Sequence, residues 1–445
     1  MNSIVSLERR KSVSGSSNRV YPEDVMITGD RYTSSSFMEL ESEKLWPAVW
    51  NIGAWAAELS EPGDFVTHQL GRESLLMVRQ PDLSVKAFHN VCPHRGNRLI
   101  QSDSGALDRF TCSYHGWEFD LDGSLTYVQD SDDFPQGNPC GKITLSQIPA
   151  EVWAGFVWYN MDENCLPLSS FLGEVKGYID LHNLQQMKRV YYKVCEVDFN
   201  WKALHDNFCE SYHLPSTHPQ IGDYFDDDYK NTDFELYDVG HSLMKMKGSL
   251  PSLRSGDPFS LNEKLFGDLT TWELDAADFM GRGHAVREAL QLQKRKLGEA
   301  KGFDHFKRLP DAWLTDAFHF NIFPATSITI LADVASLQRC EPHPTDPNKS
   351  IFHHWHMTLK ANDIELVPAP EGMVPFEEVE RREVIYGDES LGDVADQDLE
   401  RSTGQQLGFQ SRGFKGAYLS GQENRVQQFH NFIDIYLYKD MERGG

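Results

Sequence analysis

Two short motifs decide the fold, NVCPHRG at residues 90–96 and TCSYHGW at residues 111–117. Together they read Cys-x-His, a spacer of seventeen residues, and Cys-x-x-His. Each motif places two metal-binding side chains on one short loop, so two such loops can face each other across one metal centre. We therefore predict that Cys92, His94, Cys112 and His115 are the ligands of that centre.

Two kinds of centre use this ligand set. A zinc ion binds two cysteines and two histidines in a closed tetrahedral site. A [2Fe–2S] cluster binds two cysteines on one iron and two histidines on the other, which raises its reduction potential. The ligand spacing alone leaves both interpretations open.

The flanking residues favour the cluster, through a resemblance. Arg95-Gly96 and Gly116-Trp117 make the motifs similar to the Rieske family pattern CxHRG…CxxHGW. The resemblance implies a Rieske [2Fe–2S] cluster on the four ligands. Around the motifs, short β runs at 64–70, 74–80, 85–91 and 155–161 are separated by glycine and aspartate turns, which predicts a small all-β module.

A second pattern lies about a hundred residues downstream, where residues 199–219 read FNWKALHDNFCESYHLPSTHP. His213 and His218 are five residues apart, which on a straight helix turns their side chains about 140° away from each other. We expect Pro215 to break the helix and let the second histidine swing back. Two imidazoles beside a carboxylate form the facial triad of non-heme Fe(II) oxygenases. By itself the pair also fits histidines at an interface or a helix end.

Taken together, the motifs resemble the large (alpha) subunits of Rieske non-heme iron ring-hydroxylating oxygenases, from about residue 40 to 435. The resemblance implies an α+β fold, with an N-terminal all-β Rieske domain and a C-terminal catalytic domain of helix-grip type, an antiparallel sheet with helices. We expect a mobile tail at 1–20, a helical lead-in at 21–49 that packs with the catalytic domain, the Rieske domain at 50–165 and the catalytic domain at 166–445.

The third iron ligand follows from the same resemblance. The family has an acidic residue near the start of a long helix, with glutamine and glycine eight and ten residues later. Asp398 has this position here, followed by Gln406 and Gly408. Asp393 and Asp396 are rivals, because acidic residues favour the start of any helix.

The resemblance also assigns roles to Glu210 and Asn207. Most family members have an aspartate three residues before the first iron-binding histidine, where it links a Rieske histidine of one subunit to the iron histidine of its neighbour. Here the residue is Glu210, as in the branch that acts on quaternary amines such as carnitine and glycine betaine. A carboxylate that only orients His213 is the simpler interpretation. Asp206 does not match this position, and Asn207 matches the family's asparagine near the iron.

The composition is that of a globular chain, with 40% hydrophobic and 24% charged residues among 445. Its net charge of −25 disfavours nucleic acid as a partner. Seven scattered cysteines predict a reducing cytoplasm rather than a disulfide framework. We expect no membrane span and no signal peptide, because no apolar run is long enough for a span and residues 1–20 lack an apolar core.

The function implied by the resemblance is that of the terminal oxygenase of a multicomponent system. Electrons from NAD(P)H would arrive through a separate reductase, with or without a ferredoxin. One [2Fe–2S] cluster and one mononuclear Fe(II) per chain would support mono- or dioxygenation, or oxidative dealkylation, of a small aromatic molecule in aromatic compound catabolism. The expected assembly is a homotrimer, or an α3β3 complex with a small subunit.

Two alternatives remain. The first alternative is a quaternary-amine monooxygenase, which Glu210 favours. A Rieske electron-transfer protein is the second, and the intact set of His213, His218 and Asp398 argues against it.

Elsewhere the sequence predicts strands at 318–340 and 350–360 and helices at 276–300, 393–411 and 424–441. A strand from residue 190 is expected to enter a helix that continues through residue 213. HHWH at 353–356 is interpreted as strand packing rather than a metal site, and the acidic run at 226–228 as a solvated loop.

Overall fold

The computed structural model describes residues 25–254, 257, 259–362 and 364–438. The tail expected at residues 1–20 lies outside this range. Among the described residues, no helix is both long and apolar enough to cross a membrane. The chain divides into two compact units, which are described separately. The smaller unit is Glu39–Phe171 with His343–Thr345, and the larger one contains the remaining described residues.

The smaller unit is built mainly of short antiparallel strands, which confirms the all-β expectation for the first domain. Helix α2 (Ser35–Lys44) leads into it across the division between the units. A five-stranded sheet has the order β5 (Ser104–Ala106), β2 (Asp64–Leu70), β3 (Glu73–Arg79), β4 (Val85–His89) and β9 (Gln147–Ile148). Two three-stranded sheets complete it, β1 (Asn51–Trp55), β11 (Phe156–Tyr159) and β10 (Ala150–Trp153), and β6 (Phe110–Thr111), β7 (Glu118–Phe119) and β8 (Leu125–Tyr127).

One buried apolar cluster forms the core beneath the two Cys/His motifs. Its members include both cysteines of the motifs and aromatic and aliphatic side chains from several strands and loops, among them Phe65, Leu76, Phe88, Cys92, Leu99, Phe110, Cys112, Trp117 and Phe119. Because the cysteines belong to this core, they approach each other when it packs.

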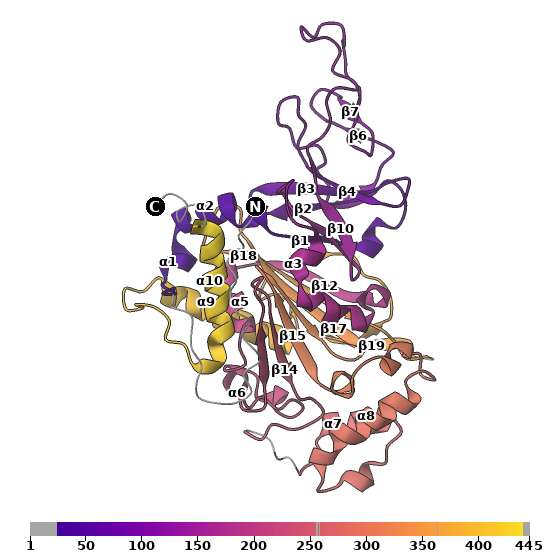
Figure 1. Cartoon of the computed structure of the whole chain (residues 1–445), viewed down its shortest axis with the longest axis vertical. Helices are drawn as coiled ribbons and strands as arrows, with labels where there is room; N and C mark the ends of the chain where they lie inside the picture. The colour runs from indigo at the N-terminus through magenta and orange to yellow at the C-terminus, as the bar shows by residue number, and fades with distance from the viewer. Residues whose placement is uncertain (1–24, 255–256, 258, 363, 439–445) are drawn as a thin grey trace. The chain divides into compact units, whose positions relative to one another are not determined.

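The larger unit contains an eight-stranded sheet, drawn in Figure 1 from magenta to orange. Its order is β13 (Asp233–Leu236), β14 (Ser242–Met246), β15 (Ala317–Ile322), β16 (Thr326–Ile330), β17 (Val334–Pro342), β18 (Ser350–Thr358), β12 (Lys188–Val197) and β21 (Arg382–Glu383). All neighbours are antiparallel except β12 and β21, so the sheet is mixed rather than purely antiparallel. The hairpin β19 (Leu366–Ala369) and β20 (Gly372–Pro375) lies apart from it. The α+β class is confirmed.

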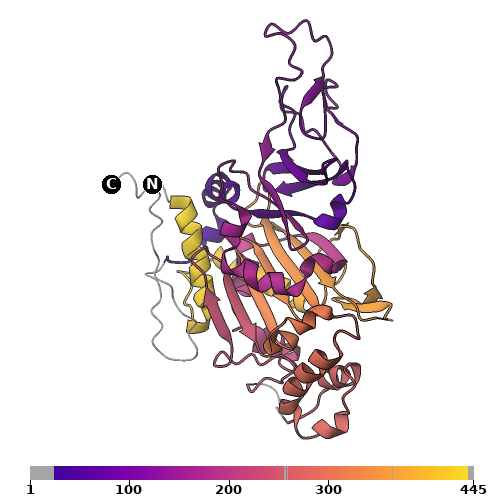
Figure 2. The ribbon, with the colours of Figure 1, turned by 45° about the vertical axis from the view of Figure 1, so that its right-hand side comes forward.

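Helices accompany this sheet, and their bounds are α1 (Asp30–Thr33), α3 (Leu168–Leu172, at the division between the units), α4 (Glu174–Ile179), α5 (Trp201–Phe208), α6 (Leu214–Thr217), α7 (Glu263–Thr271), α8 (Val286–Leu297), α9 (Asp393–Phe409) and α10 (Asn424–Tyr438). Helix α5 packs on β16 and β17, and α10 packs on β13. Figures 1 and 2 both show α7 and α8 side by side at one end of the sheet. The helix expected to run through residue 213 is shorter than predicted, because α5 ends at Phe208.

The HHWH segment lies within β18, between β12 and β17, and this confirms its interpretation as strand packing. His353 faces the Tyr192 hydroxyl at 3.1 Å, and His354 faces the Leu391 carbonyl at 3.2 Å.

The expectation for the acidic run at 226–228 is wrong. Asp226 and Asp227 are each only 1% exposed. Asn231 donates to Asp226 over 2.9 Å, and the Ser252 hydroxyl donates to Asp227. Buried carboxylates need such donors, which the local sequence pattern did not reveal.

Phe352 tests the core of the large sheet. It is fully buried on β18, paired with Cys195 on one side and Cys340 on the other. Phe352→Ala should lower the free energy of unfolding of the larger unit by about 3–5 kcal/mol, because a cavity remains where the ring was. Leu292→Ala on α8 is the control, since Leu292 is 72% exposed. Urea denaturation followed by tryptophan fluorescence measures both, and equal stabilities would contradict the assigned packing.

Candidate functional site

The two Cys/His motifs form a pair of matching loops in the smaller unit. In each loop the cysteine N–H donates to the carbonyl five residues on, Cys92 to Asn97 and Cys112 to Trp117, both at 2.8 Å. In each loop the glycine four residues on, Gly96 or Gly116, donates its N–H back to the cysteine carbonyl at 3.0 Å.

Both glycines have positive φ, 74° for Gly96 and 63° for Gly116. Residues with a side chain rarely adopt this conformation. The glycines that flank the motifs therefore have a physical role, which is to close the two loops.

The four side chains of the motifs converge as predicted. The imidazole rings of His94 and His115 have centroids 4.5 Å apart, and the Trp117 ring stacks on His94 at 4.6 Å. Cys92 and Cys112 are buried and the two histidines are half-buried. The sulfur atoms thus lie on the core side of the site and the imidazoles on its outer side.

The backbone is arranged to stabilise thiolate charge. Burial would raise the pKa of the Cys112 thiol, yet backbone N–H groups of Tyr114 and His115, with Cys92 and Asn97, lower this pKa below its ordinary value. Burial does raise the pKa of Cys92, to about 11. A metal that binds both sulfurs must therefore displace the Cys92 proton, and the four residues fit a two-cysteine, two-histidine centre.

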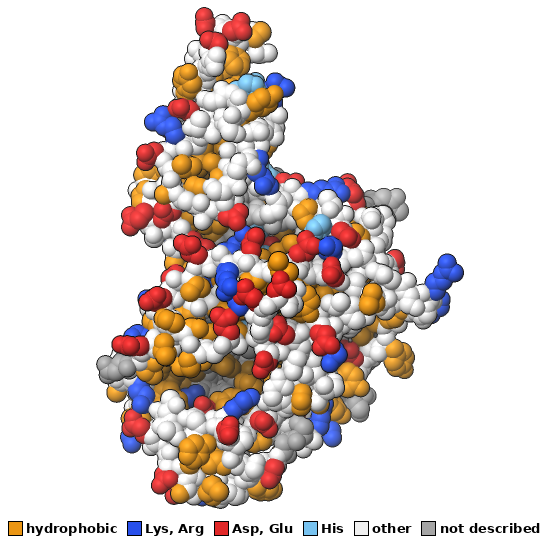
Figure 3. All heavy atoms as spheres, turned by 180° about the vertical axis from the view of Figure 1, so that it is seen from behind, with side chains coloured by type: hydrophobic (Ala, Val, Ile, Leu, Met, Phe, Trp, Pro, Cys, Tyr) orange, Lys and Arg blue, Asp and Glu red, His pale blue; other side chains and the backbone are white. Residues whose placement is uncertain are grey.

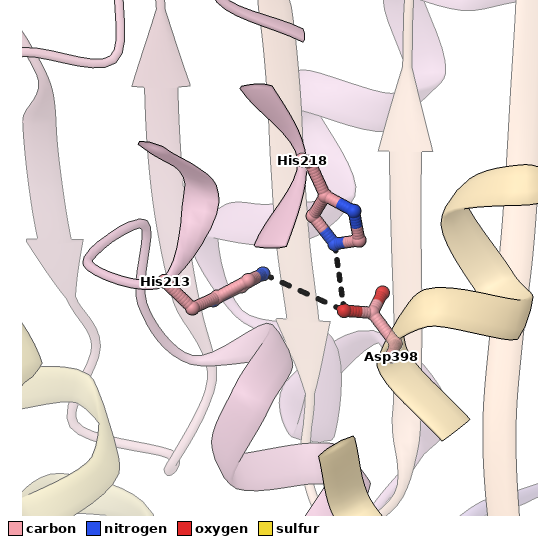
Figure 4. Close-up of side chains that lie close together, drawn as sticks. All are labelled: His213, His218 and Asp398. Atoms are coloured by element: carbon pink, nitrogen blue, oxygen red, sulfur yellow. Dashed lines mark hydrogen bonds and ion pairs between the residues drawn. The ribbon is translucent and has the colours of Figure 1, made fainter. Parts of the chain in front are cut away.

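The second candidate site lies in the larger unit, where His213, His218 and Asp398 each offer one ligand atom, all within 4.8 Å of one another. His218 Nε2 lies 2.7 Å from Asp398 Oδ1, and His213 Nε2 lies 3.6 Å from the same oxygen. Figure 4 shows both imidazoles pointing at the Asp398 carboxylate, which comes from α9. Three ligands that leave open positions fit a mononuclear metal ion of the facial-triad type.

The local backbone brings the two histidines together by a route that differs from the prediction. His213 precedes the short helix α6 and His218 follows it. Pro215 lies in the first turn of α6, a position where its missing N–H costs nothing. The chain therefore bends at the two ends of α6, and the expectation that Pro215 breaks a longer helix is wrong.

Glu210 supports this bend and orients His213. One carboxylate oxygen accepts the backbone N–H groups of Tyr212 and His213, the second at 3.0 Å. The other oxygen lies 2.7 Å from His213 Nδ1. Burial would lower the pKa of His213, but this hydrogen bond and the charges of Glu210 and Asp398 raise it above its ordinary value. With Nδ1–H donated to Glu210, Nε2 is left free for a metal.

Gln397 does the same for His218, and sequence reasoning missed it. Its Oε1 lies 2.6 Å from His218 Nδ1. Gln220 Nε2 donates to this oxygen at 2.9 Å, which fixes the orientation of the amide. The only signal in the sequence is that Gln397 precedes Asp398.

The rival carboxylates have other positions. Asp396 accepts from the Ser390 hydroxyl at 2.6 Å and from the Leu391 N–H at 2.9 Å, so it shapes the start of α9. Asp393 is exposed. Asn207 lies on α5, and its amide nitrogen is buried with no hydrogen-bond partner among the described residues. Asp206 accepts from the Tyr32 hydroxyl and lies 3.0 Å from His430 Nε2.

Comparison with known families identifies both parts of the chain. Residues 49–142 match the Rieske [2Fe-2S] domain, and residues 184–438 match the family described as ring hydroxylating alpha subunit (catalytic domain). The second match covers more than half of the chain and contains all three residues of the mononuclear site.

The curated relatives include monooxygenases and dioxygenases. The chain is 35% identical over 196 residues to the carnitine monooxygenase oxygenase subunit of Acinetobacter pittii, covering 43% of this chain and 52% of that protein. It is 34% identical over 195 residues to the benzene 1,2-dioxygenase subunit alpha of Pseudomonas putida, covering 42% of each. The chain thus spans about half the length of the curated relatives it matches.

Among solved structures, a quaternary ammonium Rieske monooxygenase, described with insights into carnitine oxidation and inter-subunit electron transfer, has a TM-score of 0.63. The likeness covers 92% of this chain and 95% of that one at 21% identity. At this identity the likeness shows a shared fold.

Asp398 and Asp396 allow a matched test of the metal site. Asp398→Ala should leave the mononuclear site largely empty, because the variant loses the carboxylate and keeps only two imidazole ligands. Asp396→Ala should retain the metal and lose about 1 kcal/mol of stability, the usual cost of a lost helix-start contact. Metal analysis and chemical denaturation measure the two effects. Loss of metal from the Asp396 variant alone would show that the ligand is assigned wrongly.

Proposed function

The chain belongs to the Rieske non-heme iron ring-hydroxylating oxygenase alpha-subunit family, and on this premise we propose that it is the terminal oxygenase of a multicomponent enzyme. It would use O2 and electrons from NAD(P)H to hydroxylate a small organic molecule. The observation that carries the proposal is the convergence of His213, His218 and Asp398 in a chain that also carries a Rieske domain.

The two sites provide complementary chemistry. When bound, a [2Fe–2S] cluster would accept and pass on single electrons, and a mononuclear Fe(II) would activate O2. Cys92, Cys112, His94 and His115 would hold the cluster. Glu210 and Gln397 would hold the Nδ1 atoms of His213 and His218, which turns the Nε2 atoms toward the iron.

Electrons would arrive from a separate reductase, with or without a ferredoxin. We propose a homotrimer, or a complex with a small subunit, in which Glu210 links His213 to His115 of the partner subunit. The solved relative described with inter-subunit electron transfer supports this arrangement. We propose a reducing compartment such as the cytoplasm, because seven scattered cysteines do not fit a disulfide framework.

The surroundings of the mononuclear site favour an apolar substrate. Leu214, next to His213, belongs to a buried cluster with Phe234, Met244, Met246 and Ala317. Figure 3 shows a hollow on one face of the molecule, with hydrophobic and charged side chains at its rim. An apolar cluster beside His213 suits an uncharged ring, so we propose a small aromatic molecule. The benzene 1,2-dioxygenase relative supports the same class.

A quaternary-amine substrate is the second candidate. Glu210 and the carnitine monooxygenase relative favour it. A quaternary ammonium group binds best among several aromatic faces. The aromatic side chains of the cluster are Phe234 and the partly buried Phe225, two faces rather than several, which is why this candidate ranks second.

Product analysis tests the proposal. The purified chain, supplied with a generic reductase, NADPH and 18O2, should convert members of an aromatic panel to products that carry the label. N-alkyl and quaternary-amine panels test the alternatives of dealkylation and amine oxidation. Iron analysis should give three irons per chain. Two irons per chain and no labelled product would instead favour a Rieske electron carrier.

Glu210→Gln tests the electron link. The amide keeps the length of the side chain but replaces one acceptor oxygen with an NH2 group, which cannot accept a hydrogen bond. The variant should retain its irons and a chemically reducible cluster, yet lose product formation about tenfold or more. Single-turnover reoxidation of a pre-reduced cluster, in O2 and substrate, measures the step. Glu210→Asp serves as the control, because it keeps the charge at shorter reach and should be intermediate. Wild-type reoxidation rates in the Gln variant would leave Glu210 with only an orienting role.

A further inference from the structure

Resting on the proposed function, we propose that Tyr32 is a positioning residue of the mononuclear iron site. Tyr32 lies on α1, far from the site in sequence, and is only 2% exposed. It joins the three helices α5, α9 and α10, which Figure 1 shows next to one another. The histidine segment follows α5, and Asp398 is part of α9, so Tyr32 holds the supports of all three ligands.

The Tyr32 hydroxyl holds α5. It donates to Asp206 Oδ2 at 2.5 Å, and Asp206 lies near the end of α5, seven residues before His213. Burial and the neighbouring Asp206 charge raise the pKa of Tyr32 well above its ordinary value, so the phenol stays a donor.

His430 of α10 completes this contact. Arg31 Nε donates to His430 Nδ1 at 3.0 Å, which leaves the His430 proton on Nε2. His430 Nε2 lies 3.0 Å from Asp206 Oδ1 and 3.0 Å from the Tyr32 hydroxyl oxygen. Each oxygen of Asp206 therefore has its own donor, one from α1 and one from α10.

The ring and backbone of Tyr32 hold α9. The ring stacks on Phe409, the last residue of α9, with centroids 3.9 Å apart and planes within 10°. Gln406 Nε2 donates to the Tyr32 carbonyl at 3.4 Å, and Gln406 Oε1 accepts the Asn200 N–H at the start of α5 at 3.0 Å. A Cβ on Gly29 would lie 2.2 Å from the Phe409 carbonyl oxygen, so only glycine permits this approach of α1 to α9.

The physical consequence concerns ligand spacing. His213 and Asp398 belong to segments almost two hundred residues apart, and the iron requires their atoms at one fixed separation. Groups behind the ligands typically contribute 10- to 100-fold to metal affinity. Removing the Tyr32 hydroxyl takes a donor from Asp206 and loosens α5 against α9, while the Phe409 stack is kept.

Tyr32→Phe makes this change, and Tyr237→Phe is its matched control. Tyr237 is buried in the same unit and donates to Glu235 at 2.6 Å, so the control also loses one hydrogen bond to a carboxylate. Protein with an intact cluster, freed of mononuclear iron by a chelator, is titrated with Co(II), whose visible absorption reports ligand geometry. Tyr32→Phe should bind Co(II) about tenfold more weakly and shift its spectrum, whereas Tyr237→Phe should do neither.

Asp206→Asn provides a second variant. If Tyr32 acts through Asp206, the double variant should lose no more Co(II) affinity than the stronger single variant. Three outcomes would overturn this inference but not the proposed function. They are fully additive losses of Co(II) affinity in the double variant, an unchanged Co(II) spectrum in Tyr32→Phe, and an equal loss of affinity in Tyr237→Phe. If Asp398→Ala bound Co(II) as tightly as the wild-type protein, the proposed function itself would be overturned.

Discussion

Everything in the larger unit depends on holding one carboxylate against two imidazoles. Asp398 is 3% exposed, and its Oδ1 lies within hydrogen-bonding distance of His218 Nε2. A buried carboxylate requires positive or hydrogen-bonding partners, and here the partners are the histidines His213 and His218. The surrounding bonds from Glu210 and Gln397 decide which ring nitrogens face Asp398. Helix α9 must therefore have one position and one rotation. Contacts of Asp396 at its start and of Gln406 near its end fix both.

In the smaller unit, backbone hydrogen bonds rather than side chains orient the cysteines and histidines. Its two loops have the same two hydrogen bonds and the same positive-φ glycine, so two copies of one turn orient the four Cys/His side chains. The loops face each other because their cysteines are part of one apolar core. Long side chains orient His213 and His218, whereas short-range backbone geometry orients the cysteines and histidines of the two loops.

Glu210 shows how one residue can combine local and functional constraints. Its carboxylate closes the bend before α6 through two backbone N–H groups and also holds the His213 ring. A substitution therefore acts on the loop and on the ligand together. For this reason the proposed link to a partner subunit has to be judged by electron-transfer rates rather than by loss of activity alone.

The sequence was enough to predict the four Cys/His residues and the His213/His218 pair, because these signals depend on short spacings. It predicted the family and the α+β class through the resemblance that the residues flanking those motifs carry. It also ranked Asp398 above Asp396, although only through resemblance. Tertiary structure decided where α5 ends and why Pro215 lies inside α6. It also decided that Asp226 and Asp227 are buried. The contacts of Gln397 and Tyr32 were decided in the same way. These features depend on partners brought from distant segments, and no local pattern encodes a hydrogen bond whose donor and acceptor meet only when separate helices pack.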